Sequence, residues 1–334
     1  MFKLKYVIIG IICALFAILP TTMPDIITAN ADGIAEIAME LTHDKVLYEK
    51  NADSKLPMAS TTKIMTALLI AEDCDLRQEL TVPDEAVGVE GSSIYLKNGE
   101  ILTVQDLLYG LILRSGNDAA TALAIYHSGS VKDFVSAMNA KAKEIGADST
   151  QFANPSGLPD DNHYTTARDL CKIACYAMKN AVFSEVAGCK NYSGDYRNFT
   201  NKNKILNSLQ GANGVKTGYT KKAGRCLVSS AKRGDMDVIC VVLNCYDMYE
   251  RSEKIIESCF DKYTVESISE NTVFYFEGRP CRLNNNYTVC IDKDKEIVFE
   301  VSPIDKTEEI SGAIAKLNIF SENDLIFSEF LYSI

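Results

Sequence analysis

The sequence predicts an α/β protein in which a smaller, β-rich part follows the main part of the chain. Two observations carry this prediction. Between residues 32 and 262, stretches with helical periodicity alternate with β-rich runs. From about Tyr263 onward, the chain contains only short apolar runs separated by turn residues, a pattern typical of strands. We therefore expect an α/β domain over 32–262 and a small β domain over 263–334.

The composition excludes two classes of protein. The chain has 334 residues, of which 47% are hydrophobic and 24% are charged, so it can bury two cores and is not intrinsically disordered. The formal net charge is −11. Binding to nucleic acid requires clustered Lys and Arg that neutralise phosphates, so no nucleic-acid partner is expected.

The first residues have the pattern of an export signal. Lys3 and Lys5 precede an apolar run over 6–19, and small residues at Ala29 and Ala31 follow it. The run is shorter than the ~20 residues that cross a bilayer comfortably. We expect residues 1–31 to be a signal peptide and the protein to be exported to the cell envelope or beyond. An uncleaved signal anchor is the weaker alternative.

The cysteines do not indicate a metal site. Ten remain after Cys13, and Cys171 and Cys175 share one face of a predicted helix. The chain has three histidines and no second pair at ligand spacing, so small buried apolar side chains are the better interpretation. We expect no metal and no cofactor.

Each element of the main domain follows from a local pattern. Two strands, 35–41 and 46–49, flank a four-residue turn. The segment Ser60–Asp73 is apolar almost all round, which predicts a helix in the centre of the domain. The other predicted elements are helices over 102–113, 119–126, 131–145 and 249–260, a hairpin over 225–231 and 237–243, and C-terminal strands over 273–276, 287–291, 297–301, 315–320 and 325–331.

Ser60 and Lys63 have the spacing of a nucleophile and its base. A serine hydroxyl is a weak nucleophile until a neighbouring group removes its proton. Residues three apart on a helix share a face, and burial beside another cation would lower the pKa of Lys63. Ser229 and Lys232 have the same spacing but lie in a predicted strand, where they point to opposite faces.

Two further clusters could complete a site. Ser115 and Asn117 lie in a polar break between two helices, where a hydroxyl could relay a proton and an amide could hold a substrate. The second cluster, at residues 216–218, would suit an edge strand. There Lys216 would supply a positive charge, Thr217 a hydroxyl, and Gly218 room for a substrate backbone. Alone, the first cluster is more simply a helix cap and the second a strand end.

Together, the three patterns are more specific. S-x-x-K, S-x-N and K-T-G occur in this order with gaps of 52 and 99 residues, and this set is typical of penicillin-binding proteins and class A β-lactamases. The flanking segments agree as well, and the chain resembles the serine-type D-alanyl-D-alanine carboxypeptidases, or low-molecular-mass penicillin-binding proteins, of peptidase family S11. The segments that carry the resemblance are 45–52, 57–66, 106–111, 117–120, 163–170 and 214–220.

The resemblance implies a fold, a reaction and a set of roles. The fold is an antiparallel sheet sandwiched by helices, followed by a small β domain. The substrates are peptidoglycan stem peptides that end in D-Ala-D-Ala, and β-lactams are covalent inhibitors. The implied roles are Ser60 as nucleophile, Lys63 as proton acceptor, Ser115 as proton relay, Asn117 as a peptide ligand, Lys216 and Thr217 as carboxylate ligands, Gly218 as space for the substrate, and the backbone N–H groups of Ser60 and Tyr219 as oxyanion hole.

The chain departs from the family pattern in three places. Residues 201–204 read Asn-Lys-Asn-Lys where Asn-Thr-Asn-Arg is frequent, which predicts an altered substrate preference. Arg225 replaces the usual aromatic residue. Some members end in a membrane-binding amphipathic helix, and the sequence printed here stops at Ile334, so we expect no C-terminal membrane anchor.

Three alternatives to a carboxypeptidase remain. A β-lactamase would need a Glu-x-x-Leu-Asn segment between Asn117 and Lys216, and none is present. A D,D-endopeptidase of the same family would use the same residues. A non-catalytic wall-binding protein would be expected to lack Ser60 or Lys63, and both are present.

Overall fold

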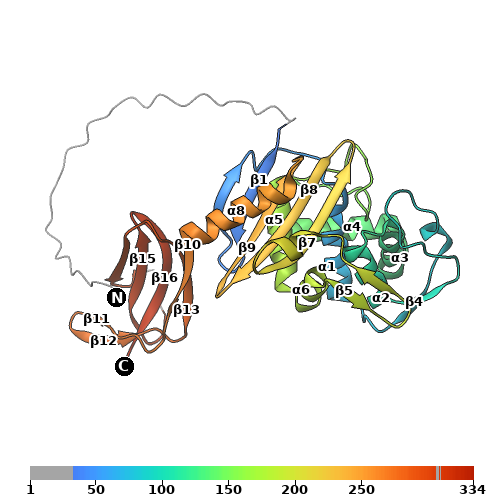
Figure 1. Cartoon of the computed structure of the whole chain (residues 1–334). Coiled ribbons are helices and arrows are strands. Elements are labelled where there is room, and N and C mark those ends of the chain that lie inside the picture. Colours follow the sequence, from blue (N-terminus) through green and yellow to red (C-terminus); the bar gives the residue numbers. More distant parts are fainter. Residues whose placement is uncertain (1–32, 306–307, 309) are drawn as a thin grey trace.

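A five-stranded antiparallel sheet forms the centre of the main domain (Figure 1). The computed structural model describes residues 33–305, 308 and 310–334, so the predicted signal peptide lies outside the described residues. The strand order is β2-β1-β9-β8-β7, which confirms that Lys216, Thr217 and Gly218 belong to an edge strand. The strands are β1 (Ala35–Glu40), β2 (Lys45–Lys50), β7 (Ala212–Thr220), β8 (Gly224–Arg233) and β9 (Met236–Leu243).

Both faces of the central sheet are covered, which explains why β1 and β9 are apolar along most of their length. Successive side chains of a strand point to opposite faces. Val228 of β8 therefore packs into the core beneath the helices, whereas its neighbour Leu227 packs into the core beneath α8 (Met248–Lys262). In the centre, β1 pairs with β9 from Ala35 opposite Leu243 to Glu40 opposite Val238.

The helices on the face opposite α8 surround one central helix. Residues 63–70 of α1 are all buried, as the apolar pattern of the segment predicts. The helix predicted from Ser60 begins as a 3₁₀ turn, η1 (Ala59–Thr62), and becomes α-helical at Lys63. The central helix is α1 (Lys63–Asp73), and the helices packed in the same core are η2 (Asp84–Ala86), α2 (Val104–Leu113), α3 (Asn117–Ser128), α4 (Val131–Ile145), α5 (Ala167–Lys179) and α6 (Ala181–Gly188). The short helix α7 (Ile205–Ser208) packs instead in the core beneath α8.

Two small antiparallel strand pairs lie beside these helices, and two element boundaries differ from those predicted. The pairs are formed by β3 (Glu79–Thr81) with β4 (Ile101–Thr103), and by β5 (Asn191–Ser193) with β6 (Asn198–Thr200). Leu102, predicted as helical, is therefore in a strand. Asn117, predicted in the polar break, is the first residue of α3.

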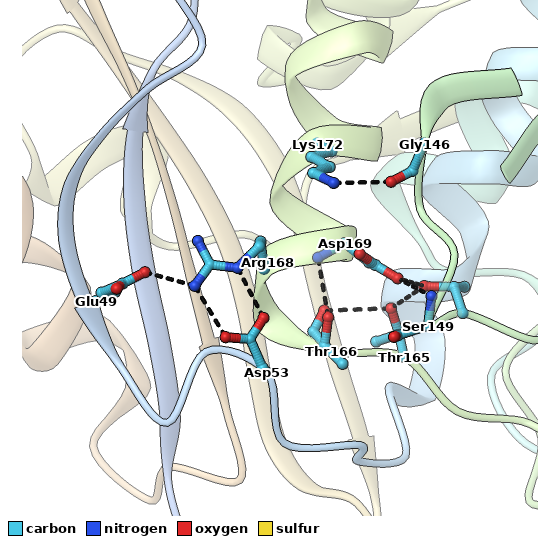
Figure 2. A network of polar contacts seen from close by, with 10 residues as sticks. Glu49, Asp53, Gly146, Ser149, Thr165, Thr166, Arg168, Asp169 and Lys172 are labelled. Carbon is cyan, nitrogen blue, oxygen red and sulfur yellow. Dashed lines mark hydrogen bonds and ion pairs between the residues drawn. The ribbon is translucent and has the colours of Figure 1, made fainter. Parts of the chain in front are cut away.

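Polar contacts fix the N-terminus of α5 to the rest of the domain (Figure 2). The side chain of Thr166 caps the helix by accepting a hydrogen bond from the backbone N–H of Asp169. The Asp169 carboxylate in turn accepts from the backbone N–H of Ser149 at 2.7 Å. Arg168 donates to both Asp53 and Glu49, at 2.7 Å each. This part of the family-like segment 163–170 is therefore architectural.

The C-terminal strands form a separate β structure that follows α8 (Figure 1). Two strands of this C-terminal part, β10 and β12, were not predicted from the sequence, and neither were the short strands β3 to β6 of the main domain. The division of the chain at residue 263 stays a prediction. One pair is formed by β10 (Tyr263–Ile268) and β13 (Tyr287–Asp292), and a five-stranded sheet by β11 (Phe274–Phe276), β12 (Arg279–Arg282), β16 (Asp324–Ser333), β15 (Ala313–Ser321) and β14 (Ile297–Ser302).

Hydrogen bonds join this β structure to the start of β2 and to the turn before it. Lys45 donates to the backbone carbonyl of Cys290 at 2.7 Å, and the imidazole Nε2 of His43 lies 3.1 Å from the Thr288 hydroxyl.

Cys171 and Cys175 are buried in α5 as free thiols. Within the described residues, no helix is long and apolar enough to span a bilayer.

Candidate active site

Ser60 and Lys63 meet where η1 passes into α1. The Nζ atom of Lys63 lies 3.1 Å from the Ser60 Oγ. Lys63 has no exposed surface, and burial together with the nearby Lys216 holds the pKa of its amine well below the usual value. Asp118 opposes this shift to a smaller extent. A buried lysine with a lowered pKa is suited to accept a proton at neutral pH.

Two further oxygen atoms contact the Lys63 amine. Asn117 Oδ1, at the start of α3, accepts a hydrogen bond from Nζ at 2.6 Å, and the backbone carbonyl of Ser156 accepts one at 2.5 Å. Asn117 was predicted from the sequence as a site residue, whereas Ser156 was not. Ser156 lies 93 residues after Lys63 and contributes only its backbone carbonyl, so no sequence motif indicates this contact.

The turn that carries Ser60 has unusual backbone geometry. Ala59 has φ +48°, in the left-handed region that few non-glycine residues adopt. The hydroxyl of Thr62 donates to the Ala59 carbonyl at 2.8 Å, and that of Thr61 donates to the Met58 carbonyl at 2.6 Å. These two bonds hold the turn in the conformation that presents Ser60.

His163 contacts the same turn through Thr62, and its imidazole ring is uncharged. Its Nδ1 accepts a hydrogen bond from the backbone N–H of Ala153 at 3.0 Å, so the ring proton is on Nε2 and donates to the Thr62 hydroxyl at 2.7 Å. Burial lowers the pKa of His163 to about 4. The ring therefore remains in one neutral tautomer near pH 7. His163 was predicted from the sequence only as part of the family-like segment 163–170.

Ser115 lies between α2 and α3, two residues before Asn117. It is nearly buried, and its backbone has φ +63°. The side-chain amide of Asn117 donates to the backbone carbonyl of Glu90 at 2.5 Å, which fixes its orientation with Oδ1 toward Lys63. The neighbouring Asp118 carboxylate accepts from the backbone N–H groups of Ile94 and Leu96. Asp118, which the sequence analysis did not single out, thus anchors the loop before β4 to α3.

The edge strand β7 brings the third cluster to Ser60. A β-carbon added to Gly218 would lie 3.0 Å from the backbone nitrogen of Ser60 and 3.1 Å from the Met58 carbonyl, so the strand passes directly along η1. The side chain of Lys216 is buried and donates to the backbone carbonyl of Thr217 at 2.9 Å. Burial, and secondarily the charge of Lys202, lowers the pKa of Lys216 to about 7. Tyr219, the next residue after Gly218, is 66% exposed.

The structure gives a physical account of one departure from the family pattern. The guanidinium of Arg225 stacks on the ring of Tyr246, with its carbon 4.5 Å from the ring centroid, and donates to the Tyr246 carbonyl. Arg225 thus packs on an aromatic ring where other members supply one. The second S-x-x-K match is not a site, because Ser229 of β8 is buried whereas Lys232 is exposed.

Comparisons with known proteins agree with this geometry. The profile of the family described as D-alanyl-D-alanine carboxypeptidase matches residues 22–247. DacF of Bacillus subtilis, a D-alanyl-D-alanine carboxypeptidase, is 38% identical over 68% of this chain and 62% of its own length. DacC of Escherichia coli, with the same description, is 36% identical over 78% of this chain and 70% of its own.

A solved structure extends the likeness to the whole described fold. The D-alanyl-D-alanine carboxypeptidase DacD of Francisella tularensis superposes with a TM-score of 0.73, at 25% identity, over 94% of this chain and 95% of its own. The predicted fold, a sheet sandwiched by helices and followed by a β-rich part, is thereby confirmed. The chain belongs to the serine-type D-alanyl-D-alanine carboxypeptidase family, as its three motifs predict.

Proposed function

We propose that this protein removes the terminal D-alanine from peptidoglycan stem pentapeptides through an acyl-enzyme on Ser60. The observation that carries the proposal is the 3.1 Å approach of the Lys63 amine to the Ser60 hydroxyl in a buried site that disfavours the charged amine. In this mechanism the neutral amine takes the hydroxyl proton while Oγ attacks the carbonyl of the penultimate D-alanine.

The departure of the leaving group requires a proton on its nitrogen. Ser115 precedes Asn117, which contacts Lys63, and we assign to it the relay of this proton from Lys63 to the departing D-alanine. The second N–H of the Asn117 amide holds the substrate peptide. Water then hydrolyses the Ser60 ester, with Lys63 again as base, and the enzyme is restored.

Recognition of the D-Ala-D-Ala end is assigned to β7. Lys216 and Thr217 hold the terminal carboxylate, and the absence of a side chain at Gly218 lets the substrate backbone approach the strand. The backbone N–H groups of Ser60 and Tyr219 form the oxyanion hole for the tetrahedral intermediate. A β-lactam, whose carboxylate and strained amide resemble this substrate, would acylate Ser60 and remain attached.

The cellular location follows from the predicted signal. Residues 1–31 would direct export, and cleavage after Ala31 would release the enzyme into the envelope space or the medium. N-terminal sequencing of the native protein, combined with fractionation, tests this proposal. A mature form beginning at Asp32 that still sediments with membranes would contradict it.

The decisive experiment measures D-alanine release from a pentapeptide that ends in D-Ala-D-Ala. Wild-type protein should release one D-alanine per peptide and should be labelled by a fluorescent penicillin. Ser60→Ala should lose both activities, whereas Ser229→Ala should retain both and serves as the matched control. Label mapped to Ser115 or Ser229 would contradict the assignment.

The same experiment separates the alternatives. An endopeptidase would cut cross-linked stem peptides faster than pentapeptides. A β-lactamase would turn over the penicillin and lose the label within minutes. A non-catalytic binding protein would neither release D-alanine nor acquire the label.

A further inference from the structure

A loop outside the three motifs holds the Lys63 amine. We define the Asn154 loop as residues 153–158, which lie between α4 and α5. The Oδ1 atom of Asn154 accepts hydrogen bonds from three successive backbone N–H groups, those of Ser156 at 3.2 Å, Gly157 at 2.7 Å and Leu158 at 3.1 Å. Its Nδ2 donates to the Leu158 carbonyl at 2.9 Å. One side chain therefore fixes the backbone of the loop.

The Asn154 loop contacts α1, and its Gly157 lies against the backbone of Ala59 in η1. The Ser156 carbonyl accepts from Lys63 Nζ, and the Pro155 carbonyl accepts from the Thr66 hydroxyl at 2.6 Å. The loop also begins at Ala153, whose N–H is held by His163. The conformation that Asn154 imposes thus determines where the Ser156 carbonyl meets the amine.

The number of donors on Lys63 makes this contact important for catalysis. A neutral amine has two N–H donors and one lone pair, whereas the Ser156 carbonyl and the Asn117 Oδ1 can only accept. If both N–H groups are donated to these two oxygens, the lone pair is left for the third neighbour, the Ser60 hydroxyl at 3.1 Å. Without the Ser156 carbonyl, the amine could rotate and direct an N–H toward Ser60.

We infer that Asn154 is a positioning residue for acylation, because it holds the Ser156 carbonyl that orients the lone pair of Lys63 toward Ser60. This inference rests on the proposed role of Lys63 as the general base. Asn154 itself has no contact with Ser60 or Lys63 among the hydrogen bonds of the described residues.

Asn154→Ala tests the inference directly. The variant removes the acceptor of three backbone N–H groups, so the loop no longer holds the Ser156 carbonyl in its position beside Lys63. We expect the second-order rate constant of acylation by a fluorescent penicillin to fall by about ten- to a hundred-fold, the range in which small misplacements of a reacting group reduce rates. Circular dichroism and the melting temperature establish how much of the variant is folded.

Asn154→Asp tests whether the oxygen acceptor alone restores acylation. Aspartate keeps the side-chain volume and the oxygen that accepts from the three N–H groups, but it loses the Nδ2 donor to the Leu158 carbonyl and places a negative charge in the loop that contacts the amine. This charge favours the protonated amine and raises the pKa of Lys63. The acidic limb of the acylation pH profile, which requires neutral Lys63, should therefore move to higher pH while the rate above the limb stays closer to wild type than in Asn154→Ala.

Asn139→Ala is the matched control. Asn139, on α4, clamps the same chain segment two residues earlier, accepting from the backbone N–H of Phe152 and donating to its carbonyl at 2.9 Å each. Its loss should lower the melting temperature without moving the pH profile or reducing acylation more than about two- to three-fold.

The outcomes distinguish this inference from the proposed function. If wild-type protein is not labelled and releases no D-alanine, the proposed function fails. If wild-type protein is active and folded Asn154→Ala acylates at the wild-type rate, the inference fails. It also fails if Asn139→Ala reproduces the effects of Asn154→Ala, because general loosening of the loop would then explain them.

Discussion

Gly157 packs so closely against Ala59 that a β-carbon on Gly157 would overlap the Ala59 carbonyl oxygen. Gly157 also has φ +87°, in the left-handed region that glycine adopts without strain. The residue before the nucleophile and the loop that contacts Lys63 are thus in direct backbone contact. The absence of a side chain at one position permits this contact.

Gly157→Ala should abolish acylation as well as destabilise the fold. The new methyl group must displace either the Asn154 loop or the turn that presents Ser60. Gly146→Ala is the matched control, because Gly146 has φ +79° with no atom within 4 Å of an added β-carbon. The control should cost only the strain of a left-handed alanine, about 1 kcal/mol, measured by urea unfolding. Equal penicillin labelling of the two variants would contradict the prediction.

Lys63→Arg should reduce acylation by about 10²-fold or more. Arginine keeps the positive charge but does not lose its proton near neutral pH, so it cannot serve as a base. Penicillin labelling rates measured at several pH values check this, and Lys232→Arg is a control that makes the same change at an exposed lysine of β8. Near-normal acylation of Lys63→Arg would show that the residue supplies only positive potential.

The pH dependence of kcat/KM should be bell-shaped, with an alkaline limb set by Lys216. Below its pKa of about 7, Lys216 is charged and can hold a substrate carboxylate; above that pH, the free enzyme loses this charge. The acidic limb reflects protonation of Lys63, whose pKa is also lowered. Lys216→Arg should move the alkaline limb upward, because the guanidinium stays protonated. If the alkaline limb of Lys216→Arg stays at the wild-type pH, the limb reflects the titration of a group other than Lys216.

Local spacing allowed the sequence to predict the catalytic cluster. Ser60 and Lys63 are three residues apart, so a helical turn brings them together, and the Lys-Thr-Gly pattern at 216–218 suited the edge strand that the structure contains. The second layer of the site was not predictable in this way. The contact of the Ser156 carbonyl with Lys63 and that of the His163 ring with Thr62 join segments far apart in the chain.

The missed elements have equally specific causes. Pro280 lies within β12, and proline cannot donate to a strand ladder, so the segment did not resemble a strand. Ser60, Thr61 and Thr62 continue the pattern of α1, but the side-chain hydrogen bonds of Thr61 and Thr62 to preceding carbonyls accompany a 3₁₀ turn. The burial that lowers the pKa of Lys216 is a tertiary property, since the helices that cover β7 come from other parts of the chain.

The pairing of β1 with β9 has a consequence for how the molecule forms. Ala35 pairs with Leu243, so a strand near the beginning of the described chain reaches its partner only after more than two hundred further residues have been synthesised. Contacts of such long sequence separation carry a large loop-closure cost and slow folding. Until β9 is available, the apolar β1 has no neighbour on one side. We expect the growing chain to depend on factors that shield this strand from aggregation, and truncation before residue 236 to leave a chain that cannot complete its central sheet.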